Sequence, residues 1–451
     1  MKLLTSLSWL VLAHAGFPDT THVTVRRDHP EDLFAGATFG AIISRDSGKN
    51  WNWICPQGMG YGGWFPESFL WQPNGDLLAA TGNALIRSRD GGCTWEAHSY
   101  FSSQGLWPVR LVSPASTPSR VWVVTSRSAA PNGLYRSDDG GDTFTAIAQL
   151  QRSDGGVYYG VQVAPSDTRR IYVTGQTPAT GLSLSRSDDE GATWTNIPHP
   201  FTEYWGTSSR PYDFVVLKVA PNDPDHLWAR VTALGWTYVL ESKDGGHTFQ
   251  SIVRPPGQTR DGLDEYIIGI EVSADGNTLW VATPTRLFRS RNGEPAVLLS
   301  LPTGNACVER QPNNDLLVCG ADREHNWILA RTQDQGETYT PFLSLADIQP
   351  PACPAGTPVH SFCRSLWPQF AASIGADPTL PGDGTDGGTT EPDPEPDPVD
   401  AGTSEEPVPP APPPPKADGC STTGGLVPAA WLLALTPLRR FRRRSLETQR
   451  T

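Results

Sequence analysis

The chain has 451 residues, enough for two or three average domains or for one large domain built of repeats. It contains 16 Trp, 44 Gly and 43 Pro but only two Met, which is typical of many short strands joined by tight turns, so an all-β class is expected. The formal net charge is −13, and no basic stripe is long enough to follow a phosphate backbone, which argues against a nucleic-acid partner.

Residues 1–15 are typical of a secretory signal peptide. A basic Lys2 is followed by an apolar run over residues 3–12 and by the small-residue sequence AHA at residues 13–15. The mature chain is therefore expected to begin near Gly16. The alternative, a buried first strand, does not account for this order of charge, apolar run and small residues.

The next region repeats one octet, which we call the box. A degenerate copy, LFRSRNG at residues 287–293, keeps Ser290 and Asn292 in register with the clear copies. Counted from the first residue of each box, the spacings are 44, 49, 50, 55, 48 and 42 residues, so there are seven repeats. The six clear copies are SRDSGKNW at 44, SRDGGCTW at 88, SDDGGDTF at 137, SDDEGATW at 187, SKDGGHTF at 242 and TQDQGETY at 332.

A second repeating feature precedes each box. An apolar run, a turn and another apolar run recur seven times, for example LKVAPNDPDHLWA before the box at 242. Three segments before each box and one after it make four short strands, and a four-stranded unit every 42 to 55 residues is the signature of a propeller blade. One such meander cannot bury both of its faces, so the blades must stack around an axis. We predict a single seven-bladed β-propeller over residues 16–350.

Each box is predicted to stabilise the turn in which it lies rather than to take part in catalysis or ligand binding. The Ser or Thr and the Asp accept hydrogen bonds from backbone N–H groups, a Gly supplies a conformation that other residues avoid, and the final aromatic packs inward. Burying that aromatic contributes about 2 to 3 kcal/mol, against about 1 kcal/mol for one hydrogen bond. The alternative, a catalytic or calcium-binding role, would not be needed at six positions related by rotation. The residues assigned this structural role are Ser44, Asp46, Ser88, Asp90, Trp95, Asp139, Asp189, Trp194, Asp244 and Asp334.

The octets resemble the Asp box, or bacterial neuraminidase repeat (BNR), whose pattern is S-x-D-x-G-x-[TN]-[WFY]. Six matches in order make the resemblance specific, and it covers about three quarters of the chain. It implies a β-propeller fold. The box is shared by sialidases, xyloglucanases, sortilin-type receptors and photosystem assembly factors, so the resemblance does not select a function.

Six cysteines lie before residue 370, an even number in a chain expected to be exported, where disulfides form. Six cysteines allow fifteen pairings. No Cys or His cluster has the spacing of a zinc site, so neither a metal nor a cofactor is expected. The predicted pairs are Cys307–Cys319 around a hairpin turn, Cys353–Cys363 after the last repeat and, by elimination, Cys55–Cys93 between the first two repeats.

Aromatic residues gather where loops lead into the innermost strands of five consecutive blades. The face of the propeller that these loops form, the axial face, is suited to stacking on sugar rings or to binding a loop of a partner protein. The alternative is that these aromatics plug the channel or pack between blades. The candidate ligand-binding residues are Tyr61, Trp64, Trp107, Tyr158, Tyr159, Trp205 and Tyr212.

A glycoside hydrolase is the second functional hypothesis. Sialidases carry an Arg-Ile-Pro motif before the first box, where this chain has Arg26-Arg27-Asp28 instead, and xyloglucanases pair two propellers around a cleft. Hydrolysis needs two carboxylates about 5 to 10 Å apart, and the candidates are Asp213 with Asp264 or Glu265.

The end of the chain differs in composition. Residues 351–371 form a Cys-containing extension, and residues 372–419 a linker. From Asp377 to Asp418 there are eleven acidic residues and one Lys, which is ten of the thirteen net negative charges. This Pro-rich stretch has no apolar periodicity and cannot bury enough surface to fold, so we expect an extended, self-repelling spacer.

Residues 420–451 begin with Cys420, after which an apolar stretch at 425–438 precedes five Arg residues. Fourteen residues are short for a membrane span of about 20, and the Arg cluster would stay on the cytoplasmic side. The arrangement resembles the myxobacterial C-terminal sorting signal MYXO-CTERM. The resemblance implies contact with sorting machinery, lipid attachment near Cys420 and display at the cell surface or outer membrane. The alternative is an ordinary membrane helix near the tail.

The preferred interpretation is a non-catalytic, exported propeller that binds an extracellular glycan or protein through its aromatic axial face. The acidic linker and anchor would project this head away from the membrane. A purely structural component of the envelope is the third hypothesis.

Overall fold

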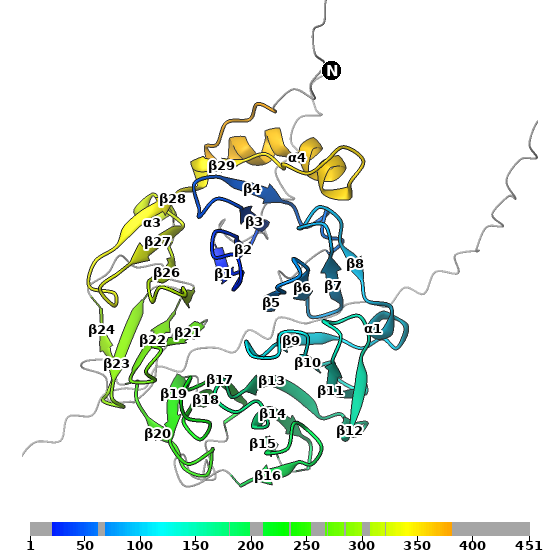
Figure 1. Ribbon diagram of the computed structural model, residues 1–451, viewed down its shortest axis with the longest axis vertical. Helices are drawn as coiled ribbons and strands as arrows, with labels where there is room; N and C mark the ends of the chain where they lie inside the picture. The colour runs from blue at the N-terminus through cyan, green and yellow to red at the C-terminus, as the bar shows by residue number, and fades with distance from the viewer. Residues whose placement is uncertain are drawn as a thin grey trace, which may run out of the picture. The chain divides into compact units, whose positions relative to one another are not determined.

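In the computed structural model, seven antiparallel sheets stand around a common axis like the blades of a propeller (Figure 1). The prediction of seven four-stranded blades is confirmed. All the described residues belong to one compact unit of the chain. The structure describes residues 20–61, 68–179, 181–198, 211–233, 236–253, 267, 269–283, 286–299, 307–320 and 322–380.

The strands of each blade follow one another along the chain. Blade 1 contains β1 (Thr20–Val25), β2 (Leu33–Ala37), β3 (Gly40–Ser44) and β4 (Trp51–Ile54). Blade 2 contains β5 (Ser68–Trp71), β6 (Leu77–Ala80), β7 (Leu85–Ser88) and β8 (Glu96–Ala97). Blade 3 contains β9 (Pro108–Val112), β10 (Val121–Thr125), β11 (Asn132–Ser137) and β12 (Thr145–Arg152). Blade 4 contains β13 (Val157–Val163), β14 (Ile171–Thr177), β15 (Gly181–Ser187) and β16 (Thr195–Ile197).

The remaining blades repeat this order. Blade 5 contains β17 (Asp213–Val219), β18 (Leu227–Ala233), β19 (Trp236–Ser242) and β20 (Gln250–Ser251). Blade 6 contains β21 (Gly269–Val272), β22 (Thr278–Ala282), β23 (Leu287–Arg291) and β24 (Val297–Leu298). Blade 7 contains β25 (Val308–Arg310), β26 (Leu316–Cys319), β27 (Leu329–Thr332) and β28 (Thr340–Leu343). Short helices are α1 (Ser99–Ser103), α3 (Asp322–His325) and η1 (Leu345–Asp347).

The first strand of each blade lies nearest the axis, and successive inner strands contact one another around the ring (Figure 1). The second strands are buried along their whole length in most blades, for example LFAGA in β2 and VWVVT in β10. Both faces of such a strand are covered by neighbouring blades, which is why its sequence is a continuous apolar run rather than an alternating one.

The boxes lie on the turns between the third and fourth strands, as predicted, and three hydrogen bonds recur in every clear copy: from the Ser or Thr hydroxyl to the Asp, from the Gly N–H to that hydroxyl, and from the N–H two residues after the Gly to the Asp. In the second box, the Ser88 hydroxyl donates to Asp90 Oδ1 (2.9 Å) and accepts the N–H of Gly92 (2.8 Å). Asp90 Oδ1 also accepts the N–H groups of Cys93 (3.0 Å) and Thr94 (2.8 Å). The Asp carboxylate therefore stabilises the backbone of the turn in which it lies.

The box glycines also form the contact between blades. Gly191 has φ +84°, and a Cβ at this position would lie 2.7 Å from Trp122 of blade 3, so no side chain fits there. The corresponding glycine of every clear box faces a side chain of the preceding blade. These pairs are Gly48 with Phe342, Gly92 with Ile54, Gly141 with Leu78, Gly191 with Trp122, Gly246 with Leu184 and Gly336 with Leu299.

The chain after blade 7 closes the ring over blade 1. β29 (Ile348–Gln349) pairs in parallel with β4, so blade 1 has a fifth strand at its outer edge. The sequence did not predict α4 (Pro358–Ile374), which follows along the same edge (Figure 1). The Thr357 hydroxyl caps its first turn, and Gly375 ends it in the left-handed conformation. The Phe370 ring of α4 stacks on Trp53 of β4 at 4.2 Å.

Two of the three predicted disulfides are wrong, and Cys307–Cys319 is confirmed. Cys55 pairs with Cys363, and Cys93 pairs with Cys353. The physical reason is the path of the C-terminal segment, which runs over blade 1 and places its two cysteines beside those of blades 1 and 2. Cys363 lies on the buried side of α4 and accepts the N–H of Cys55 (3.0 Å). We call these two bonds the clasp.

The boxes are expected to make the fold sensitive to acid. Burial raises the pKa of Asp139, but hydrogen bonds from Thr143 and Ser137 outweigh it and hold the pKa at about 2; Thr338 likewise lowers the pKa of Asp334 to about 2. A carboxyl whose pKa is depressed by folding stabilises the protein fully above its unfolded pKa, near 4, and this contribution is lost as the pH falls toward 2. Urea midpoints should therefore drop between pH 4 and 2. Asp139→Asn should be less stable than wild type at pH 6, and the difference should shrink as the pH falls through 2; a constant difference between the two proteins would contradict this.

Among the described residues, no helix combines the length and apolar character that a membrane crossing requires. The predicted signal peptide and the sorting segment with Cys420 lie outside the described residues, as does the linker after residue 380. The first residues of the predicted linker are ordered, because α4 continues to Ile374 and the Trp367 indole N–H donates to the carbonyl of Asp377 (3.1 Å).

Candidate functional site

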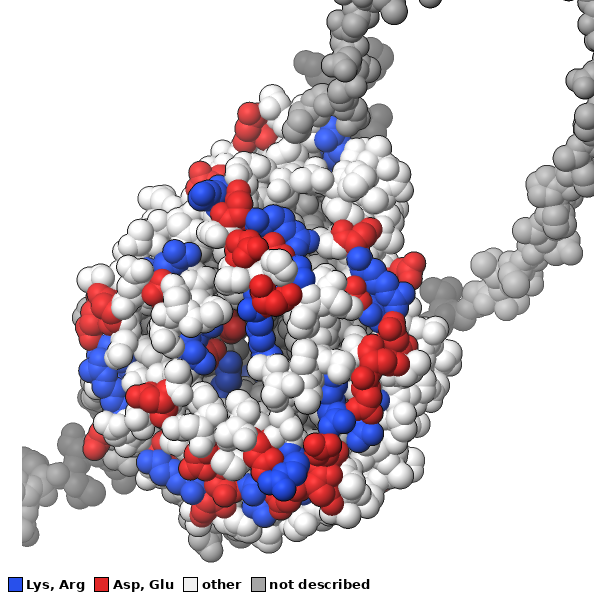
Figure 2. Space-filling model, viewed as in Figure 1, with Lys and Arg blue, Asp and Glu red and all other residues white. Residues whose placement is uncertain are grey.

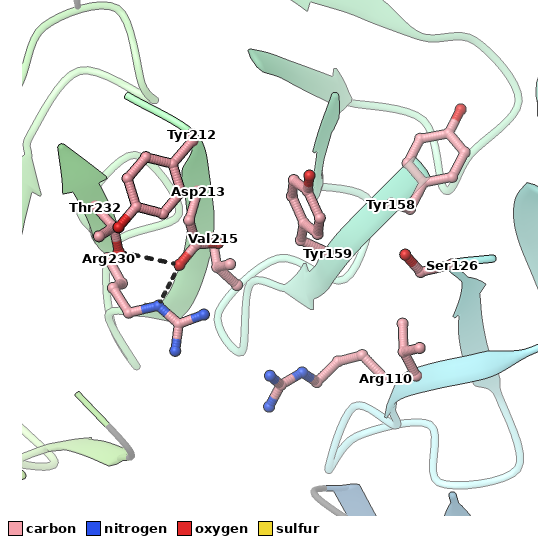
Figure 3. Close-up of a pocket in the computed structure, with 10 residues that line it drawn as sticks. Arg110, Ser126, Tyr158, Tyr159, Tyr212, Asp213, Val215, Arg230 and Thr232 are labelled. Atoms are coloured by element: carbon pink, nitrogen blue, oxygen red, sulfur yellow. Dashed lines mark hydrogen bonds and ion pairs between the residues drawn. The ribbon is translucent and has the colours of Figure 1, made fainter. Parts of the chain in front are cut away.

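A pocket of about 410 Å³ opens where the inner strands of blades 3, 4 and 5 begin (Figure 3). Strands β9, β13 and β17 supply most of its lining, together with the ends of β10 and β18. It brings together four of the residues predicted from the sequence, Tyr158, Tyr159, Tyr212 and Asp213. The volume lies within the range of about 300 to 1,000 Å³ that is usual for ligand pockets.

Asp213 is held on one wall of the pocket by fixed partners. The pairing of β17 with β18 places it opposite Thr232, whose hydroxyl donates to Asp213 Oδ2 (3.3 Å). Arg230 Nε donates to the same oxygen (2.9 Å), and its Nη1 donates to the carbonyl of Ile267 (3.1 Å). Two donors on one oxygen hold the Asp213 carboxylate in a single orientation. This arrangement suits a fixed hydrogen-bond acceptor.

Two tyrosines complete the pocket in different ways. The Tyr212 side chain is 58% exposed, the most exposed of the large apolar and aromatic residues described, and its backbone N–H donates to the Thr232 carbonyl (3.0 Å). Tyr159 is half-buried, and its hydroxyl donates to Gln176 Oε1 (2.7 Å). Burial raises the pKa of Tyr159. The ring of Tyr212 is therefore accessible to a ligand, whereas the ring of Tyr159 is held in place by its hydrogen bond to Gln176.

The other predicted aromatics are arranged differently. Tyr158 is 1% exposed; its ring is turned away from Tyr159 and lies under the Arg152 guanidinium at 4.6 Å (Figure 3). Tyr61 is 9% exposed and packs in the hydrophobic core of blade 1, away from the pocket, so its role is packing. Trp107 is 39% exposed and lies outside the pocket lining, with Arg127 stacked on it at 4.8 Å. The predicted residues Trp64, Trp205, Asp264 and Glu265 lie outside the described residues.

The axial channel next to the pocket is rich in charged groups. On the face drawn in Figure 2, the ring is hollowed at its centre, and Lys and Arg side chains gather there beside fewer acidic ones. Lys218 and Glu271 form an ion pair at 2.8 Å. Burial and the neighbouring Glu271 carboxylate raise the pKa of Glu309 to about 7. Within the described ranges, no group of three or more His, Cys, Asp or Glu residues is placed to hold a metal ion.

In sequence, the chain is similar to a xyloglucanase from a Paenibacillus species, at 26% identity over 249 residues. The match takes in 47% of this chain but only 23% of the relative, so the chain spans less than a quarter of that enzyme's length. No family model matches the chain.

Two solved structures are similar in fold. YCF48 from Cyanidioschyzon merolae is 14% identical with a TM-score of 0.48, over 68% of this chain and 93% of that one. The GH74 xyloglucanase from Xanthomonas campestris is 14% identical with a TM-score of 0.39, over 73% of this chain and 52% of that one.

Two residues of the pocket, Arg110 and Arg230, were not predicted from the sequence. Both guanidinium groups extend into the space between β9 and β17 (Figure 3). A signal for them is present, because each is a lone charge inside an otherwise apolar strand, PVRLV in β9 and LWARVTA in β18. A charge placed in a buried strand needs a partner or a function.

Proposed function

We propose that the propeller is a non-catalytic binding module that holds an extracellular glycan at the pocket formed by Tyr159, Tyr212 and Asp213. The observation that carries this proposal is the combination of an open aromatic face with fixed polar groups in one pocket. Sugar rings have apolar faces that stack on aromatic rings and hydroxyl groups that bond to fixed acceptors and donors. Asp213, already bound to Arg230 and Thr232, is an acceptor of this kind.

Replacing Tyr212 with Ala is expected to weaken glycan binding about tenfold or more, because a buried aromatic anchor contributes at least about 1.4 kcal/mol to binding. The change should leave the melting temperature unaltered, since the side chain is exposed. A glycan array followed by calorimetry on the best ligand measures the effect. The matched control is Phe362→Ala, which removes an aromatic that is 53% exposed on α4.

Equal binding by wild type and Tyr212→Ala would contradict the proposed site. If no glycan bound but a peptide ligand did, the glycan part of the proposal would be wrong.

A glycoside hydrolase is the second candidate, and the similarity to a xyloglucanase is the observation that favours it. Asp213 would then act with Asp264 or Glu265. The hydrogen bonds from Arg230 and Thr232 favour the binding module, since they hold the Asp213 carboxylate as a fixed acceptor. If the protein released reducing sugar from xyloglucan and Asp213→Asn abolished this activity, the hydrolase would be favoured over the binding module.

The three disulfides indicate an oxidising compartment. We propose further that the chain belongs among Asp-box proteins, that its first 15 residues direct export, and that residues 420–451 act as a MYXO-CTERM-like sorting signal with lipid attachment near Cys420. In this proposal the acidic linker, which begins after residue 380, displays the propeller at the cell surface. Metabolic labelling with a fatty acid, compared between wild type and Cys420→Ser, tests the anchor.

A further inference from the structure

We infer that the glycan site extends from the pocket onto blade 3, where Trp107 stacks a further sugar of the same chain. The inference rests on the proposed function and adds a requirement for chain length, because a ligand that contacts both the pocket and Trp107 must be an oligosaccharide or a polysaccharide. Three features of Trp107 support it: its position, the support of its ring and the hydrogen-bond donor at the edge of that ring.

Trp107 lies next to the pocket. It directly precedes β9, just as Tyr212 directly precedes β17, so the two residues occupy equivalent positions in blades 3 and 5. The Trp107 carbonyl accepts the N–H of Ser126 (2.9 Å), which lines the pocket. Figure 3 shows Ser126 and Tyr212 on opposite sides of the pocket, with Tyr159 between them. A chain of sugars laid across the start of blade 4 therefore reaches both Tyr212 and the blade that carries Trp107.

Exposed aromatic rings are uncommon in the part of the chain that the structure describes, and two of them flank this pocket. Trp107 is 39% exposed and Tyr212 is 58% exposed. The other exposed large apolar side chains lie on α4 and on the outer strand β24; these are Phe362, Val297 and Leu298. Trp107 and Tyr212 are thus the exposed members of this group that lie where inner strands begin.

The Trp107 ring is held in place by Arg127, whose guanidinium lies over it at 4.8 Å. Arg127 is itself fixed, since its Nη1 donates to the Gly105 carbonyl (2.9 Å) and its backbone N–H donates to Asn132 Oδ1 (2.7 Å). Asn132 is 1% exposed, and its side chain donates to the carbonyl groups of Arg127 (2.9 Å) and Gly156 (2.9 Å). A ring that is fixed before the ligand arrives loses little conformational entropy on binding.

The edge of the Trp107 ring presents a donor that the fold does not use. Seven other Trp indoles donate to a backbone carbonyl, namely those of Trp51, Trp53, Trp71, Trp95, Trp194, Trp280 and Trp367. The Trp107 indole makes no hydrogen bond to any residue that the structure describes. A flat aromatic face with a donor at its edge matches a sugar, which has an apolar ring face and hydroxyl groups around it.

Two aromatic platforms on blades 3 and 5 favour a long ligand over a single sugar. Sheets that face each other pack about 10 Å apart, and blades 3 and 5 are two steps apart around the ring, so one sugar ring is too short to touch both platforms. A linear glycan repeats the same flat face along its length, and each platform can therefore stack one of its units.

The test uses the exported protein and four series of oligosaccharides, cello-, manno-, xylo- and chito-, each from the disaccharide to the octasaccharide. Calorimetry should show that affinity for at least one series rises tenfold or more from the disaccharide to the longest chain, because a second aromatic contact is added. Trp107→Ala should abolish this rise and leave binding of the disaccharide unchanged, whereas Tyr212→Ala should weaken binding at every length. Trp107→Phe, which keeps a smaller ring without the N–H donor, should retain part of the rise.

The control variant, Phe362→Ala, removes an exposed aromatic on α4 and should match the wild type at every chain length. Melting curves of all variants show that they fold. An affinity that did not rise with chain length in the wild type, or that rose equally in Trp107→Ala, would overturn the inference and leave the proposed function standing. Weaker binding of the disaccharide by folded Trp107→Ala would also overturn it, because Trp107 would then belong to the pocket itself. If no chain of any length bound the wild type, the proposed function would fail together with the inference.

Discussion

Removing both clasp disulfides, by replacing their four cysteines with Ser, is expected to lower the free energy of unfolding by at least about 5 kcal/mol. The bonds join residues 308 and 260 positions apart, so they constrain almost the whole unfolded propeller. Cross-links that close long loops remove the most entropy from the unfolded chain. Urea unfolding of the variant and the wild type, both without reductant, measures the difference.

The Cys307–Cys319 bond provides the control. It spans 12 residues within blade 7, and its removal is expected to cost about 3 kcal/mol. A cost equal to or larger than that of the clasp would show that ring closure does not depend on the clasp.

Trp51→Ala is expected to destabilise the protein by about 3 to 5 kcal/mol, the usual cost of deleting a fully buried Trp. Trp51 is the aromatic of the first box, 1% exposed, at the seam where blade 7 meets blade 1. Its ring lies 6.4 Å from that of Phe342 in β28, and its indole N–H donates to the Gly48 carbonyl (3.0 Å). Thermal and urea unfolding give the free-energy change.

A comparison with Trp194 distinguishes the contribution of burial from that of the hydrogen bond. It occupies the same box position and donates to the Gly191 carbonyl at 3.0 Å, but its side chain is only half-buried. Trp194→Ala should therefore cost clearly less than Trp51→Ala. Equal costs would mean that the hydrogen bond, rather than burial, dominates at this position.

The boxes were predictable because their interactions are local. Ser88, Asp90 and Gly92 bond to one another within five residues, so the motif already contains its partners. The number of blades followed from the spacing of these motifs. The role of the box glycines at the contact between blades was not predicted, because the side chain facing each glycine comes from the preceding repeat.

Some of the candidate residues lie together in the structure. Tyr159, Tyr212 and Asp213 meet in one pocket because the starts of inner strands converge at the axis. Tyr158 and Tyr159 are neighbours on one strand, where successive side chains point to opposite sides, and only Tyr159 remains partly accessible. The pairing of Asp213 with Arg230 depends on the register between β17 and β18, which sequence spacing does not reveal.

The sequence by itself determined the all-β class, the seven repeats and the turn that each box forms, since periodic strands and short-range hydrogen bonds are encoded within each repeat. Only the tertiary structure decided how the ring closes, which cysteines pair and which charges face the pocket. Those outcomes depend on contacts between residues hundreds of positions apart, such as Cys55 with Cys363, and the partners of such contacts are selected by the path of the whole chain.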